Sequence, residues 1–120
     1  MLTDLLAEIE RQGDPAAVGL ELFFDGNDDP ASIGCNLDEH PGVGTFARVL
    51  RAVRDRPEVD DVLVGISEVM PDGEWPFSDT VHVLTAASAG DVAGWVAGLG
   101  PDDVAKAELN GRPAIALWWD

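Results

Sequence analysis

Apolar residues recur at the spacing i, i+3, i+4 and i+7 in three segments of the chain, which is the period of an amphipathic helix. The segments are residues 3–12, residues 45–55 and the stretch from Ser88 to Gly100. Thr3 and Ser88 favour the N-cap position, because a hydroxyl there accepts a hydrogen bond from a backbone N–H that has no other partner. The pattern therefore predicts three helices.

Alternation of apolar and polar residues predicts strands. The segments with this pattern are residues 18–25, 32–37, 59–70, 80–86 and 113–120. A further segment, residues 101–108, is expected to add one helical turn. The order α-ββα-ββα-β indicates a single α+β domain over residues 1–120, with one mainly antiparallel sheet of about five strands and helices packed on one face.

The same alternation identifies the sheet face that points away from the helices. If Val62, Val64 and Val81 point toward the helices, the positions between them point away. This predicted ligand face carries small residues, two aromatic rings, a carboxylate and a histidine: Glu21, Phe23, Gly34, Asn36, Gly65, Ser67, His82 and Trp118. Small residues leave room and aromatic residues supply contact area, so the face is a candidate binding surface. The alternative is that the loop containing Trp75, or a second chain, covers it.

The composition is that of a folded protein, with 46% hydrophobic and 25% charged residues. No apolar run approaches the roughly 20 residues of a membrane span. The amphipathic N-terminal segment lacks the basic start of a secretory signal. The one cysteine, Cys35, cannot form an internal disulfide, and we expect it on the core side of its strand. These features predict a cytoplasmic protein, and six Arg to one Lys is typical of a high-GC bacterial genome.

The net charge of −16 restricts the kind of partner that the protein binds. An acidic surface repels the phosphates of DNA, RNA and anionic lipids, so we expect neither nucleic acid nor membrane as a partner. It attracts a basic protein or a cation. The alternative is that the acidity serves only solubility.

Two loops concentrate this charge. The first, "FFDGNDDPASIGCN" at residues 23–36, is not an EF-hand calcium loop, because Pro30 stands where the loop needs glycine and Asn36 where it needs glutamate. It is expected to be a hairpin turn that offers carboxylates to a partner, with a looser cation site as the alternative. The second loop, "MPDGEWPFSDT" at residues 70–80, adds aromatic anchors.

We predict that both loops contact a basic protein, through Asp25, Asp28, Asp29, Asp72, Glu74, Trp75, Phe77 and Asp79. Charge complementarity would accelerate association and the aromatic residues would anchor the complex. The alternative is that Trp75 and Phe77 fold back over the sheet.

Other candidate chemistry is weaker. His40 and His82 lack the spacing of a metal site, so we expect no metal and no cofactor. Three arginines, Arg48, Arg51 and Arg54, form a basic ridge opposite the apolar side of the second helix. The ridge could dock against the acidic loops of another copy in a homodimer, bind an anion, or pair with nearby carboxylates.

Two functions fit these features. The first is a non-enzymatic binding protein, such as an immunity or inhibitor protein that neutralises a basic partner through its acidic loops. The second is a small-molecule or metal-ion site on the ligand face around His82. That site would be catalytic if Glu21 and His82 served as acid and base between Trp118 and Phe23. We predict the binding protein.

Overall fold

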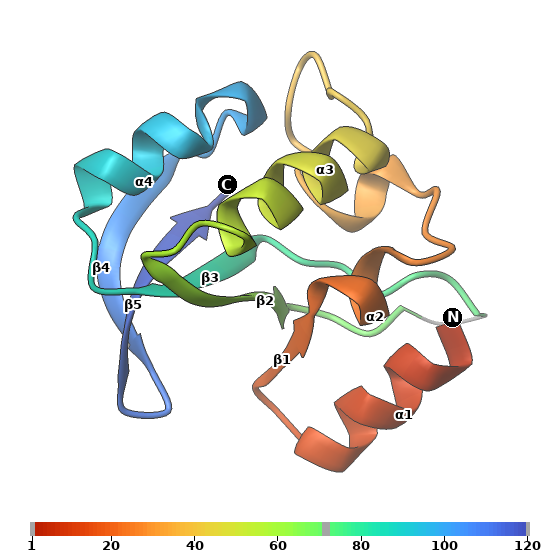
Figure 1. The fold of residues 1–120 in the computed structure, drawn as a ribbon. Coiled ribbons are helices and arrows are strands. Elements are labelled where there is room, and N and C mark those ends of the chain that lie inside the picture. The colour runs from red at the N-terminus through yellow and green to blue at the C-terminus, as the bar shows by residue number, and fades with distance from the viewer. Residues whose placement is uncertain (1, 71–72, 120) are drawn as a thin grey trace.

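The computed structural model describes residues 2–70 and 73–119, which form an α+β fold around one antiparallel sheet of five strands. The elements are α1 (Leu2–Gln12), β1 (Ala16–Gly19), α2 (Leu20–Phe24), η1 (Pro30–Ser32), α3 (Val43–Arg54), β2 (Val59–Ile66), β3 (Thr80–Thr85), α4 (Ala89–Trp95), η2 (Ala97–Leu99), β4 (Asp103–Leu109) and β5 (Arg112–Trp118). The strand order is β1-β2-β3-β5-β4 (Figure 1). The predicted fold class is confirmed. No helix among the described residues is both long and apolar enough to cross a membrane.

The core lies between the sheet and the helices. Figure 1 shows α2, α3 and α4 on one side of the sheet, with α1 beside β1 at its edge. The sheet contributes alternate residues to this core, all at most 2% exposed: Val18, Val62, Val64, Val81, Val83, Ile115 and Leu117. Burying one such side chain stabilises the fold by about 1.5–3 kcal/mol. The alternation read from the sequence is therefore confirmed for the central strands.

Residues 20–24 form the short helix α2, so the strand predicted over residues 18–25 is wrong beyond Gly19. The same residues also carry a helical period, because Leu20, Phe23 and Phe24 are buried. Phe23 is fully buried and does not belong to the open face of the sheet. Five residues are too few to form a stable helix alone, so tertiary contacts hold α2 in place.

Two other predicted elements are also wrong. The strand predicted over residues 32–37 is absent: Ser32 ends η1, and residues 33–37 form a loop in which Gly34 has a φ of 66° and Cys35 is exposed rather than in the core. Residues 103–109, expected to be partly helical, form the edge strand β4. Asn110 and Gly111, a residue pair typical of tight turns, join β4 to β5, and both have positive φ, which suits a tight antiparallel hairpin.

The free edge of β1 is capped by a side chain. The Gln12 Nε2 donates to the Ala17 carbonyl at 2.9 Å, and the Ala17 N–H donates to the Gln12 Oε1 at 2.9 Å. The amide thus replaces the neighbouring strand that an edge lacks. This contact also fixes the end of α1 beside the sheet.

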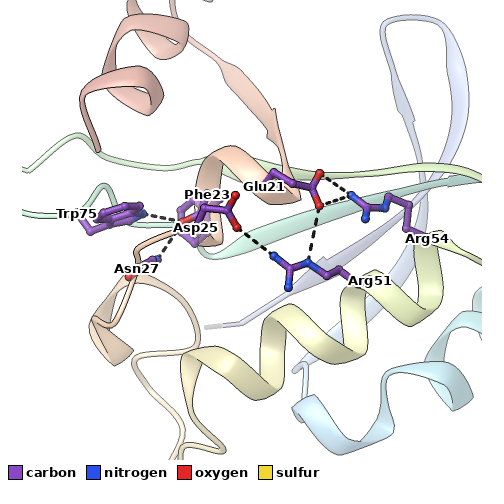
Figure 2. A network of polar contacts seen from close by, with 7 residues as sticks. All are labelled: Glu21, Phe23, Asp25, Asn27, Arg51, Arg54 and Trp75. Atoms are coloured by element: carbon purple, nitrogen blue, oxygen red, sulfur yellow. Dashed lines mark hydrogen bonds and ion pairs between the residues drawn. The ribbon is translucent and has the colours of Figure 1, made fainter. Parts of the chain in front are cut away.

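The helices α2 and α3 are joined by ion pairs (Figure 2). Both carboxylate oxygens of Glu21 accept from the Arg54 Nη1, at 2.7 and 2.8 Å. The Arg51 Nη2 donates to the Asp25 Oδ1 at 3.2 Å, and the Arg51 Nε lies 3.7 Å from the Glu21 Oε2. Two members of the predicted basic ridge therefore pair locally. Arg48 lies elsewhere, in a groove between α3 and Trp95.

We predict that Gly34→Ala lowers the free energy of unfolding by at least about 2 kcal/mol. A Cβ at Gly34 would lie 2.7 Å from the Phe46 Cζ, and its φ of 66° is unfavourable for alanine. The matched control, Gly94→Ala in α4, meets no atom within 4 Å and should stabilise by ~0.5–1 kcal/mol. Urea denaturation measures the free energy of unfolding of both variants. Equal changes for Gly34→Ala and Gly94→Ala would contradict the constraint at Gly34.

We predict that the contribution of Glu21 to stability decreases in acid. The hydrogen bonds from Arg54 lower the pKa of Glu21 below its ordinary value of 4.5. A lowered folded-state pKa stabilises the fold above the unfolded pKa, and this stabilisation is lost as pH falls through the folded pKa. Because the side chain is 56% exposed, Glu21→Gln should cost only about 0.5 kcal/mol at pH 7.

Urea denaturation of the wild type and of Glu21→Gln at several values between pH 7 and pH 2 measures the difference in their free energies of unfolding. Arg54→Gln breaks the same Glu21–Arg54 ion pair. Its loss of stability relative to the wild type should therefore decrease with falling pH in the same way. A difference between wild type and Glu21→Gln that stays constant over this range would contradict the ion pair.

Candidate functional site

The two acidic loops, distant in sequence, are bonded to each other. The Ser78 N–H donates to the Ser32 carbonyl at 2.7 Å. The Trp75 Nε1 donates to the Phe23 carbonyl at 2.8 Å, and the Asn27 Nδ2 donates to the same oxygen at 3.2 Å (Figure 2). The second loop is closed at its base, where the Phe77 N–H donates to the Glu68 carbonyl at 2.8 Å. Both loops are therefore held in fixed positions relative to α2.

A cleft of about 300 Å³ lies where the loops meet. We call it the acidic cleft, and its lining residues are Asp29, Ala31, Cys35, Glu68, Met70, Glu74, Trp75 and Phe77. Its described lining residues include three carboxylates and two aromatic rings. Carboxylates attract a cation, and a cation over an aromatic face is stabilised by the ring quadrupole. The cleft is thus chemically suited to a lysine or arginine side chain.

The acidic cleft contains four of the residues predicted to bind a partner: Asp29, Glu74, Trp75 and Phe77. Asp25 lies outside it and pairs with Arg51. Asp28 is exposed but does not line the cleft, and Asp79 accepts hydrogen bonds from the hydroxyls of Ser67 and Thr80. Asp72 lies outside the described residues.

Sequence reasoning missed Glu68, Met70 and Cys35 as lining residues. The pattern over residues 59–70 predicts Glu68 inside a strand, and the pattern over residues 32–37 predicts Cys35 in the core. Trp75 is half-buried and packs against the core, as the folded-back alternative supposed, yet it also lines the cleft. No local signal in the sequence predicts that these residues meet. The hydrogen bonds that bring the two loops together, Trp75 to Phe23 and Ser78 to Ser32, join residues about 50 positions apart.

A second and larger cavity, about 850 Å³, lies on the sheet face opposite α3. We call it the sheet pocket. Its lining comes from the end of α1, from β1, β2 and β3, and from the turn between β4 and β5. Its lining residues are Arg11, Gln12, Pro15, Ala16, Ala17, Leu63, Gly65, Ile66, Ser67, Thr80, His82, Leu109 and Asn110.

His82 is the distinctive group of the sheet pocket. Its Nδ1 is buried and has no hydrogen-bond partner among the described residues. Burial lowers the pKa of His82 below its ordinary value of 6.5, because a charged imidazole loses its hydration. The ring is therefore neutral near pH 7.

The predicted ligand face is assembled only in part. His82 and Ser67 line the sheet pocket, and Trp118 is exposed on the same face without lining it. Glu21 pairs with Arg54 on the helix side of the sheet. It therefore does not face His82, and the proposed acid/base pair is not formed.

Phe23 is fully buried and cannot form a wall of the site. Asn36 lies in the loop after η1, where its amide donates to Asp102 at 3.3 Å.

The other histidine is structural. The Gly42 N–H donates to the His40 Nδ1 at 2.9 Å, so the proton is on Nε2, which donates to the Ile33 carbonyl at 2.7 Å. The described residues contain no group of three His, Cys, Asp or Glu side chains placed to hold a metal ion. The looser cation site considered for residues 25–29 therefore has no ligand cluster in this part of the chain.

Comparison with known proteins gives the relatives of this chain. A family model described as "Uncharacterized protein YfbO family" matches residues 1–116. A protein of Escherichia coli (strain K12), "Uncharacterized protein YfbO", is 30% identical over 115 residues, which cover 86% of this chain and 81% of that protein. No solved structure matches. The match over nearly the whole length shows that the chain belongs to the YfbO family.

Proposed function

We propose that this protein is a non-enzymatic binding domain that holds a basic side chain of a partner protein in its acidic cleft. The observation that carries the proposal is the convergence of two loops on one cleft with three carboxylates and two aromatic residues. A cavity of about 300 Å³ is at the lower end of ligand sites, so it suits a single side chain better than a whole metabolite.

The charge of the whole molecule supports the same function. A net charge of −16 produces a field that attracts a basic protein from a distance. The cleft then supplies the short-range contacts, in which aromatic residues contribute most of the binding energy. Field and cleft therefore favour the same class of partner.

The preformed cleft favours a binding role that needs little rearrangement. Its position is fixed by hydrogen bonds to the Phe23 carbonyl and by the pairing of Ser78 with Ser32. Rigid binding surfaces lose little entropy on association. An immunity or inhibitor protein of the bacterial cytoplasm, which must neutralise a toxin enzyme quickly and tightly, is the class that we propose.

The partner can be sought by affinity capture with the tagged protein from its native cells, followed by washes of increasing salt and mass spectrometry. We expect a basic protein in stoichiometric amount that high salt releases, because screening weakens the electrostatic attraction. Capture of further copies of this chain alone would instead indicate a homodimer and would contradict the proposal.

We predict that Glu74→Lys weakens binding of the captured partner at least about tenfold, because it places a positive charge in the cleft. The control is Glu108→Lys on β4, which changes the net charge equally but lies outside the cleft. It should weaken binding by less than about threefold, through the long-range field alone.

Isothermal titration calorimetry at constant salt measures both affinities. Equal losses for the two variants would show that only the net charge matters and that the cleft is not the interface. Trp75 is less suitable for this test, because its replacement also breaks the bond to the Phe23 carbonyl and so affects the fold.

A further inference from the structure

The sheet pocket differs in its charge from the rest of the protein. The chain has 23 Asp and Glu residues, yet none of the described residues that line this pocket is acidic. Its polar groups are the amides of Gln12 and Asn110, the hydroxyls of Ser67 and Thr80, and His82. Side chains of leucine, isoleucine, proline and alanine make up most of the remaining lining.

Arg11 is the one permanently charged side chain among the described residues that line the pocket, and it is already paired. The guanidinium of Arg11 donates to both carboxylate oxygens of Glu8, one turn earlier on α1, and is largely exposed to solvent. A cationic ligand would find no counter-charge in the pocket, and an anionic ligand would meet the negative field of the whole molecule. The pocket therefore favours a ligand without net charge.

His82 supplies the directional contact. Its Nε2 lies over Gly65, since a Cβ at that glycine would come within 3.4 Å of it, and Gly65 is part of the pocket floor. The buried Nδ1 has no acceptor among the described residues, and an unpaired buried N–H is rarer than an unpaired acceptor. In the neutral ring the proton is therefore on Nε2, where it can be donated into the pocket.

Small residues give the pocket its depth. Ala17 and Gly65 are paired across β1 and β2, and neither carries a side chain beyond Cβ. A larger residue at either position would fill this end of the cavity. The volume of about 850 Å³ is within the range of small-molecule sites.

We propose that the sheet pocket binds an uncharged small molecule, with an apolar body and a carbonyl or hydroxyl oxygen that accepts a hydrogen bond from His82. This site is separate from the acidic cleft, which lies between the loops on other residues. The proposal therefore does not depend on the proposed partner-binding function.

The probe for the first test is prodan, an uncharged naphthalene dye with one ketone oxygen, whose fluorescence reports transfer into an apolar site. We expect saturable binding to the wild type. Ala17→Phe should weaken it at least tenfold by filling the pocket, and the Gln12 bonds to the Ala17 backbone would remain. The control, Ala105→Phe, changes an exposed residue outside the pocket on the same face and should alter affinity less than twofold.

The second test isolates the hydrogen bond. His82→Phe preserves an aromatic ring but removes the donor, so prodan should bind about tenfold more weakly. The same dye without its propionyl group should bind wild type and His82→Phe equally. Circular dichroism and thermal melting establish that each variant is folded.

Three results would overturn the proposal. The first is an absence of saturable prodan binding to the wild type. The second is equal affinity of Ala17→Phe and Ala105→Phe for prodan, which would show that the dye binds outside the pocket. The third is tighter binding of the anionic dye anilinonaphthalene sulfonate than of prodan, which would contradict an uncharged ligand.

Discussion

The carbonyl of Phe23, at the end of α2, is the contact on which the arrangement of the loops depends. The last carbonyls of a helix have no partner within the helix. This one accepts from Asn27 in the first acidic loop and from Trp75 in the second. A single oxygen thus anchors both loops, and the ion pairs from Arg54 and Arg51 hold its helix against α3. The acidic cleft follows from this anchoring.

The second constraint is that all the helices but α1 lie on one face of the sheet (Figure 1). That face forms the core, whereas the opposite face keeps small residues and the neutral His82. The two cavities consequently have different chemistry. The cleft is acidic and lies in the loops of a strongly acidic protein, while the sheet pocket has no carboxylate among its described lining residues.

The errors in prediction have physical causes. The segment around Phe23 fits both a strand and a helical period. Tertiary contacts favour the helix, namely the burial of its apolar side and the bonds with Arg54 and Trp75. The alternation around Gly34 predicts a strand, but the positive φ of Gly34 and its close approach to Phe46 require a loop. β4 lacks strong alternation because it is an exposed edge strand. Four of the eight residues predicted for the ligand face, Gly65, Ser67, His82 and Trp118, lie on the open side of the sheet. The other four belong to the misassigned segments around α2 and Gly34.

Thr3 lies inside α1, so the N-cap predicted there is wrong. Sequence patterns do predict the three amphipathic helices, the Ser88 cap, the central strands, the Asn110-Gly111 turn and the negative charge. Each of these depends on residues close together in the chain, whose preferences are local. Tertiary contacts set the form of residues 20–37, the pairing of β4, the meeting of the two loops and the neutral pocket beside His82. These features depend on contacts between distant residues, and the free energy of such contacts outweighs the weak preference of a short segment.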